Sequence, residues 1–529
     1  MEFVELSDSR CVLPKDSYRQ VNLTCDLATS RTSCGLFAYF INYLELFFCL
    51  LPIPTFSIYG LISAVILLAY FCVLFMLTKY FFVPNLVTLI QFAPMTMFGI
   101  SFLISGPSFF ASYYISDWKV CNSPEKVLTP VQFSKIVGDI LRYFLIGVMT
   151  ICTQGYRAEG VTLWSCMSFI LVGTGYLFAV TKKSYQVEKG NTDEHLAKFR
   201  VIVFLYIFVI VLLVIFVVSH TTYQRNSEKR KQKENIFWDM DSGDEILGKY
   251  EKQRVFTKKQ IWLRTINGRK NMKDLHVIYR IIMMPIYFIA SLFIPVITKD
   301  RFLVGFRKHV CCICLIVLPF IFLLHGFKAF VWIMMLLVCW LLSILVFIST
   351  HPLRRPDNVW LFALLGLITS SAVMNLFFGG IENITWQYIS VHFDVMPDVV
   401  ALMYFELGGM FCQVIVVRCL QLRKMWDATF GVVMSMVTYS ILLAFPLLYF
   451  QGCYNPSCKL IITASTETGI HFLFLILSTS LLHISMSGYE FRLSLLFYLL
   501  TLTVFYVTIQ WMVHYGWILS LATLYELKK

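Results

Sequence analysis

A few polar side chains lie inside long apolar segments, where they could serve as ligands for a cation. Two of them are carboxylates: Glu406, and Glu382, which lies just past its apolar segment and is expected near a membrane interface. The others offer neutral oxygens, and these are Ser101, Ser108, Asn375 and Gln413. An ionisable side chain is costly in an apolar environment, so such a residue is a functional candidate. The alternative is a structural role, in which the carboxyl is paired or protonated and a serine hydroxyl bonds to its own backbone.

Other kinds of reactive group give no pattern. The histidines in and near the apolar segments are scattered without the close spacing of a metal motif: His325, His392, His471, His483 and His514. The sequence contains no phosphate-binding loop, nucleophile elbow or paired-carboxylate hydrolase pattern. We therefore expect neither an enzyme nor a cofactor.

The elements that hold these side chains follow from the composition. The chain has 529 residues, of which 58% are hydrophobic and only 14% charged. Soluble domains carry about 25% charged residues, so this shortfall argues against a soluble enzyme, a disordered regulator or a nucleic-acid binder. Apolar stretches of about 20 residues recur along the chain, and each could cross a hydrocarbon core of about 30 Å. The sequence predicts an all-α polytopic membrane protein.

The first half of the chain predicts five spans. They run over 55–78, 84–116, 136–154, 160–180 and 201–220. The second is too long for one straight crossing and contains Pro94, Gly99, Gly106 and Pro107, which interrupt a helix. We expect a broken helix there.

The polar regions around these spans indicate the orientation of the chain. The loop 221–276 is strongly basic, which places it in the cytoplasm. Five preceding crossings then put 1–54 on the opposite side, where a sequon at Asn22 predicts glycosylation. Four cysteines there, Cys11, Cys25, Cys34 and Cys49, predict disulfides with three possible pairings. The acidic start of the chain resembles neither a signal peptide nor a mitochondrial presequence.

Eight apolar segments follow the loop. They are 278–298, 309–325, 328–350, 359–379, 395–418, 429–450, 467–485 and 490–516. Eight full crossings would place three basic clusters outside, against the charge rule. If 278–298, which contains Pro285 and Pro295, is re-entrant or interfacial, all three clusters return to the cytoplasm. We therefore expect 12–13 transmembrane helices, with twelve true crossings favoured and both termini outside.

This topology divides the chain into two membrane halves, 55–220 and 351–529, with additional membrane segments at 277–350 between them. The halves enter the membrane in opposite senses, which is the arrangement of an inverted-repeat transporter. In such folds the substrate site lies near the midplane, where one broken helix of each half frees backbone groups. The second helix of each half is therefore the place to look, although its glycines could equally serve close helix packing.

Several stretches carry a resemblance to a known family. They are the spacing of Cys25, Cys34 and Cys49 around Tyr43-Leu44-Glu45, then Phe82-Val83-Pro84-Asn85-Leu86, Trp360 to Ser370, and Tyr489-Glu490-Phe491 with Leu493 to Leu500. In order and spacing the chain resembles the calcium/cation antiporter superfamily, and within it the mitochondrial-type sodium/calcium exchangers. The resemblance implies two inverted five-helix repeats, and inorganic cations as substrates: sodium, calcium or protons.

The ion-binding motifs of that family are altered here. Its active members carry Gly-Asn-Gly-x-Pro-Asp in the first repeat, where this chain has Gly106, Pro107 and Ala111 at the Gly, Asn and Asp positions. The second repeat, Gly-Asn-Ser-x-Gly-Asp in the family, here has Gly408, Gly409 and Gln413. Both aspartates are absent, so monovalent or proton-coupled transport through Glu406 and Gln413 is favoured over calcium exchange.

Three hypotheses follow for a protein of the plasma membrane or an internal membrane. The first is a divergent cation antiporter that works by alternating access. The alternative is a transport-inactive paralogue that acts as a membrane binding or regulatory protein. A seven-helix chemosensory receptor would suit the composition, but the number of spans and the split halves oppose it.

Overall fold

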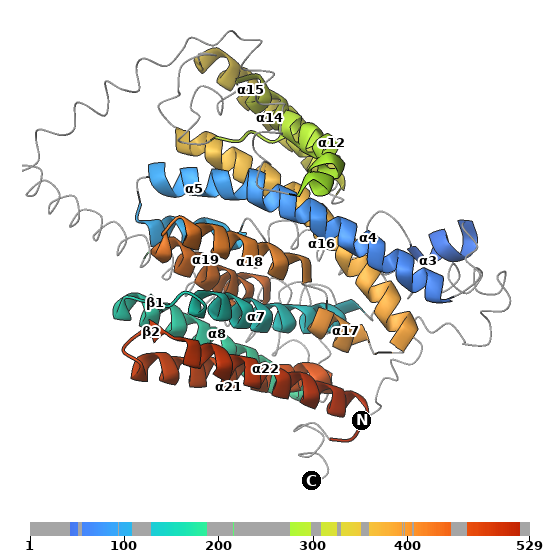
Figure 1. Ribbon diagram of the computed structural model, residues 1–529, viewed down its shortest axis with the longest axis vertical. Helices are drawn as coiled ribbons and strands as arrows, with labels where there is room; N and C mark the ends of the chain where they lie inside the picture. Colours follow the sequence, from blue (N-terminus) through green and yellow to red (C-terminus); the bar gives the residue numbers. More distant parts are fainter. Residues whose placement is uncertain are drawn as a thin grey trace, which may run out of the picture.

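The computed structural model describes residues 43–50, 56–93, 95–107, 128–187, 215, 276–297, 308–324, 329–350, 359–393, 395, 397–404, 407–445 and 463–518. Their helices and strands, coloured along the chain in Figure 1, are α3 (Tyr43–Glu45), α4 (Phe56–Leu77), α5 (Val83–Phe92), a helix Met97–Pro107, α7 (Leu128–Cys152), β1 (Tyr156–Arg157), α8 (Gly160–Val187), α12 (Val277–Phe293), α14 (Lys308–Leu324), α15 (Ala329–Ser349), α16 (Val359–Phe393), α17 (Pro397–Tyr404), α18 (Leu407–Leu422), α19 (Trp426–Tyr439), α21 (Ala464–Met486), β2 (Glu490–Phe491) and α22 (Leu493–His514). Three π-helical turns, Leu46–Leu50, Thr78–Phe82 and Ser440–Ala444, continue neighbouring helices.

Eight helices in the described ranges are long and apolar enough to cross a membrane. They are Ile58–Phe92, Gly160–Leu177, Trp332–Ser349, Val359–Ile389, Asp398–Leu422, Trp426–Ala444, Ala464–Met486 and Leu493–His514. α7 has 25 residues, about 37 Å at 1.5 Å per residue, but it also carries three charged side chains. The protein is therefore an all-α, multi-pass membrane protein. The predicted number of 12–13 helices stays a prediction, since the span 201–220 lies almost wholly outside the described residues.

The first predicted spans need a correction. The first predicted span, 55–78, extends further, because one continuous helix runs from Phe56 to Phe92 through the π-helical turn. Pro84, which has no backbone N–H to donate, lies directly after this π-helical turn. The helix ends at Ala93, which is extended (ψ 149°) because the following Pro94 disfavours helical geometry before it. A second helix then begins at Met97.

This long helix and α16 form an antiparallel pair. Added Cβ atoms on glycines at the interface would meet the opposite helix in reverse order: Gly366 meets Asn85, Gly380 meets Tyr70, and Gly60 meets Tyr388. α16 contains 35 residues and continues well past the predicted end at residue 379. Glycine at these positions lets large side chains of the partner helix approach closely.

α7 lies at the centre of the next layers (Figure 1). It packs against α17, α18, α19, α21 and α22. The sequence prediction began this span at residue 136, whereas the helix begins at Leu128. The described polar side chains before residue 136, Gln132, Ser134 and Lys135, are buried within the protein. Ser134 illustrates this, because its hydroxyl is fully buried and bonds to Thr466 of α21.

Four neighbouring helix pairs run parallel. The helix 97–107 lies alongside α19 in the same direction, since Phe98 stacks on Phe430 and the Gly106 N–H donates to Ser435 Oγ at 2.7 Å. α18 runs parallel to α7, as two glutamine contacts described below show. α8 runs parallel to the α19 segment, because Gly173 lies beside Ile441 and Tyr176 beside Phe445. α21 runs parallel to α7, with Thr466 beside Ser134 and Gly469 beside Val137.

One end of the molecule is fixed by a short ladder. β1 and β2 pair antiparallel, with Tyr156 opposite Phe491 and Arg157 opposite Glu490. The Tyr156 hydroxyl donates to Asp427 Oδ1 at 2.9 Å, which brings the α18–α19 turn to the same end. Exposed basic residues gather here, namely Arg157, Arg418, Arg423, Lys424 and Arg492. The positive-inside tendency predicts that this end faces the cytoplasm.

An outer layer consists of α12, α14 and α15, at the top of Figure 1. α15 exposes large apolar side chains around most of its surface, among them Leu341 and Ile348, as a helix in lipid does. The chain after α12 leaves the helix and runs along α5. There the Asn85 side chain donates to Pro295 O at 2.9 Å and accepts from the Ile297 N–H at 3.1 Å. This segment is the end of 278–298, which we expect to be re-entrant or interfacial.

Candidate functional site: the charged face of a buried helix

α7 carries three charged residues on one face. Lys135, Asp139 and Arg142 follow at spacings of four and three residues, which places them on the same side of a helix. Lys135 is 5% exposed and Asp139 only 1%. Charged groups are rare inside membrane helices and are retained there mainly for pathways, relays or paired contacts. The face is therefore the strongest candidate site in the described part of the chain.

Lys135 forms an ion pair with Glu382 of α16. The Nζ atom lies 2.8 Å from Oε1, and the two side chains are 6% and 11% exposed. The pair joins residues 247 positions apart in the sequence. Glu382 lies inside α16, eleven residues before its end, because this helix is longer than its apolar core alone predicts. Its expected place near a membrane interface stays a prediction.

Arg142 connects α7 with α17. Its Nη2 donates to Ala401 O at 3.2 Å and lies 3.6 Å from Asp139 Oδ1, while Nε donates to Gly138 O at 3.0 Å. Close approach of the two helices requires Gly138, because an added Cβ there would lie 2.4 Å from Leu402 O. The guanidinium thus neutralises a buried carboxylate and binds a backbone carbonyl of α17 at once.

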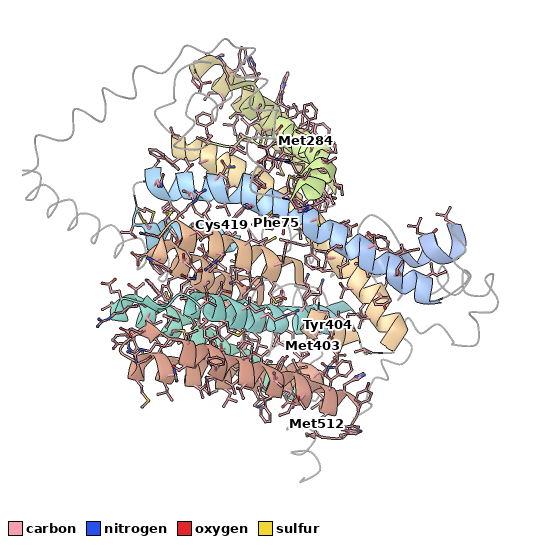
Figure 2. The ribbon with its side chains drawn as sticks, viewed as in Figure 1. Phe75, Met284, Met403, Tyr404, Cys419 and Met512 are labelled. Atoms are coloured by element: carbon pink, nitrogen blue, oxygen red, sulfur yellow. The ribbon has the colours of Figure 1, made fainter. Side chains whose placement is uncertain are left out.

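α17 and α18 cover most of the predicted span 395–418, and α18 extends beyond it to Leu422. Figure 2 labels Met403 and Tyr404 at the end of α17, beside α7. Phe405 and Glu406, which follow, lie outside the described residues. The role predicted for Glu406 therefore stays a prediction.

Further polar groups extend the charged face towards α21 and α22. The Gln510 side chain donates to Ser465 O at 3.1 Å. Tyr506 is buried near Arg142, and its hydroxyl lies 3.6 Å from the position of an added Cβ on Gly469. Asp398, in the first turn of α17, is 3% exposed. The centre of the molecule is thus polar where α7, α17, α21 and α22 meet.

Gln413, a predicted candidate, binds the backbone of α7. Its Nε2 donates to Tyr143 O at 3.1 Å, and the side chain is fully buried. Gln421, two turns further along α18, donates in the same way to Thr150 O at 3.0 Å. No hydrogen-bond partner accompanies the Gln413 Oε1 atom in the described structure, so this amide oxygen is available to a ligand.

The described candidate residues in and near the first motif take part in helix packing. Ser101 donates to Met97 O and Phe98 O of its own helix, as in the structural alternative. Gly106 is buried against Tyr439 and Ser435 of the α19 segment, and Pro107 ends the described part of this helix. Ser108 and Ala111 lie outside the described residues.

The glycines of the second motif also serve packing. Gly408 and Gly409 are buried within α18, and a Cβ on Gly408 would lie 2.8 Å from Phe378 of α16. Asn375 is 6% exposed on α16, with Nδ2 at 3.5 Å from Ser371 Oγ. The structure does not place Asn375 in contact with the charged face of α7.

Most of the predicted extramembrane sites fall in undescribed parts of the chain. Cys49 is disulfide-bonded, and the nine other described cysteines form no disulfide. Cys11, Cys25, Cys34 and Asn22 lie outside the described residues, so their pairing and glycosylation stay predictions.

The charge of the site limits which ion it could hold. Asp139 and Glu382 each face a cation of α7, namely Arg142 and Lys135. Calcium requires six to eight oxygens with substantial negative charge. No three His, Cys, Asp or Glu side chains within the described ranges come together as a metal site.

Sequence reasoning identified Glu382 and Gln413 but missed the three charged residues of α7. A signal was present, because Asp139 and Arg142 lie within the predicted span 136–154 and charged residues in spans are exceptional. Lys135 was excluded because the predicted span began one residue after it. Comparisons with protein-family models, curated proteins and solved structures find no match for this chain.

Proposed function

We propose that this protein is a membrane transporter that exchanges monovalent cations or protons by alternating access between two inverted halves, 55–220 and 351–529. The proposal rests mainly on one observation, which is that helix contacts in the first half recur in the second with the halves exchanged.

The recurrence covers the described members of each half. The helix 97–107, second in its half, runs parallel to the third helix of the other half, α19. In the same way α18, in the second crossing of its half, runs parallel to the third helix of the first half, α7.

The fourth helices repeat this relation. α8 runs parallel to α19, and α21 runs parallel to α7. The first helices pair with each other antiparallel, as do the third, since Phe133 and Gly147 of α7 meet Phe445 and Val433 in reverse order. A pseudo-two-fold axis in the membrane plane produces such exchanges, and it is typical of alternating-access transporters.

The buried charges favour this function over a purely structural one. The Lys135–Glu382 pair connects α7 of one half to α16 of the other, so relative movement of the halves would change its surroundings. The resemblance to the calcium/cation antiporters points to cation exchange. The loss of both motif aspartates and the pairing of Glu382 with a lysine favour sodium, potassium or protons over calcium.

Ion flux in proteoliposomes tests the proposal. We expect sodium or proton flux driven by an imposed gradient of the other cation, and a fall of at least about tenfold, or 1.4 kcal/mol, in Glu382→Gln. Glu406→Gln tests the second predicted carboxylate in the same assay. Glu159→Gln is the matched control, because it removes an exposed carboxylate near β1 and should leave flux unchanged. Calcium uptake comparable with sodium uptake would contradict the choice of ion.

A transport-inactive membrane protein with a binding or regulatory role is the second candidate. The observation that favours it is that neighbouring side chains fill the space beside Gly106 and Gly408. Folded wild-type protein without sodium, potassium, proton or calcium flux would support this candidate and refute the transporter.

A further inference from the structure

Lys79 is a basic residue in the interior of the first membrane helix, Ile58–Phe92. It belongs to the π-helical turn Thr78–Phe82, and its side chain is half-buried. The ammonium lies 5.3 Å from the ring centroid of Phe75 and 5.5 Å from that of Tyr80. Within the described part of the chain, no acidic side chain forms an ion pair with it. A charge in a membrane span is costly without a counter-charge, so Lys79 calls for an anionic partner.

Arg423 brings a second cation to the same region. It follows the end of α18, is exposed, and likewise has no acidic partner among the described residues. The charges of Lys79 and Arg423 both act on the thiol of Cys419, a half-buried residue of α18. Figure 2 labels Cys419 and Phe75 on these two neighbouring helices. Two unpaired cations, one from each half of the chain, therefore lie around one thiol.

The surface of α18 beside Cys419 is apolar as well as basic. Val414, Arg418 and Leu422 follow one another at spacings of four residues, so they share one face of the helix, and all three are exposed. The exposed fraction is 37% for Val414 and 70% for Leu422. A ligand with an anionic head and an apolar chain matches both parts of this surface, whereas a small inorganic anion matches only the charges.

We propose that an anionic phospholipid binds here, with its phosphate held by Lys79 and Arg423 beside Cys419 and an acyl chain along Val414. Basic sites between membrane helices on the cytoplasmic side bind anionic headgroups, and this end of the molecule is the one predicted to be cytoplasmic. The guanidinium of Arg423 can donate two parallel N–H bonds to a phosphate, while the ammonium of Lys79 acts as a compact charge.

The bound lipid would connect the two halves of the molecule. Lys79 belongs to the half 55–220 and Arg423 to the half 351–529, so a phosphate that contacts both favours the arrangement in which the two cations are close. This lipid site is independent of the proposed transport, because none of its residues belongs to the charged face of α7.

Thermal unfolding of the purified full-length protein in detergent micelles tests the lipid site. A ligand that binds only the folded state raises the melting temperature. Phosphatidylglycerol is compared with phosphatidylcholine of the same acyl chains and with sodium phosphate, all at one ionic strength. We expect only phosphatidylglycerol to raise the melting temperature of the wild type. The concentration for half-maximal stabilisation should rise by about tenfold or more in Lys79→Met/Arg423→Gln.

Arg492→Gln is the matched control. Arg492 is another exposed cation at the same end, but it is paired with Glu490 at 2.6 Å, so its loss should leave the lipid response unchanged. An unchanged response in Lys79→Met/Arg423→Gln, or an equal loss in Arg492→Gln, would overturn the proposed site. Stabilisation by sodium phosphate equal to that by phosphatidylglycerol would assign the site to a free anion and overturn the choice of a lipid.

Alkylation of wild-type protein covers the case in which the double variant does not fold. N-ethylmaleimide is neutral, and peptide mass spectrometry identifies the modified cysteines. Phosphatidylglycerol should slow the modification of Cys419 several-fold but not that of Cys339 in α15, which is also half-buried. Equal rates with and without the lipid at Cys419, or equal slowing at both cysteines, would refute the lipid site. Absence of ion flux with the lipid response intact would refute only the proposed transport.

Discussion

Gly138 determines how closely α7 and α17 approach each other. A Cβ at this position would lie 2.4 Å from Leu402 O and 2.7 Å from Arg142 Nη2, both closer than real Cβ atoms come. The absence of a side chain therefore allows the bond from Arg142 to Ala401 O. At the scale of single residues, the charged face depends on a glycine as much as on its charges.

We predict that Gly138→Ala destabilises the protein by about 1–3 kcal/mol, the usual cost of overpacking. The backbone oxygen that it would meet cannot move without shifting α17. Thermal unfolding of purified protein measures the change. Gly175→Ala is the control, since Gly175 of α8 has no atom within 4 Å of an added Cβ. That variant should be neutral or slightly stabilising, and equal losses in both variants would contradict the prediction.

Among the elements, the short ladder β1–β2 ties the ends of several helices together through Tyr156. Its hydroxyl donates to Asp427 Oδ1 in the first turn of α19, and its ring packs against Phe430 and Phe491. Burial raises the pKa of the Tyr156 phenol well above its usual range, and the charge of Asp427 adds to the effect. The protonated phenol is therefore part of the folded state.

This shift predicts a loss of stability at alkaline pH. A folded-state pKa raised above the unfolded value of about 10 leaves the stabilisation complete below pH 10, and it is lost progressively as the pH rises above that value. Tyr156→Phe cannot ionise, so its melting temperature should fall less steeply above pH 10. At neutral pH the same variant should be less stable by about 0.5–1.5 kcal/mol, because one hydrogen bond is lost.

Asp427→Asn is the companion variant. It removes a charge but not the burial of the phenol, which is the larger cause, so most of the alkaline slope should remain. Melting temperatures measured across the alkaline range check both variants. Parallel curves for wild type and Tyr156→Phe would show that Tyr156 does not contribute.

For the whole molecule, the described helices place three connections at one end. These are β1, the α18–α19 turn and β2, joined by the ladder and by Tyr156 with Asp427. α22 starts beside this end and, as a 22-residue helix, finishes on the opposite side. The exposed basic residues at the three connections predict that this end is the cytoplasmic face.

We predict that single cysteines at Thr153, Arg423 and Arg492 react with an impermeant maleimide only from the cytoplasmic side. A cysteine at Tyr515, an exposed residue after α22, should react only from the other side. Labelling of intact and inverted membrane vesicles measures the sides, with wild-type labelling subtracted. Reaction of Thr153 and Tyr515 variants from the same side would refute the fold-derived topology.

The sequence by itself determined the class of the protein and most of its helices. Lipid offers no hydrogen bonds to the backbone, so apolar segments such as 328–350 and 467–485 must be helical, and their positions can be read directly. The helix end at Ala93 is similarly local, since it follows from Pro94. Boundaries were wrong where polar residues are buried by other helices, as at the start of α7.

Only the tertiary structure decided which polar side chains meet. Glu382 and Gln413 were recognisable as unusual in apolar segments, but their partners, Lys135 and the carbonyl of Tyr143, lie 247 and 270 residues away in the sequence. Hydrophobic periodicity reports whether a residue is near lipid or protein, and it is silent on which helices are neighbours and in what register. The ion pair exists because α17 packs against both α7 and α16 and so brings the two helices into one core.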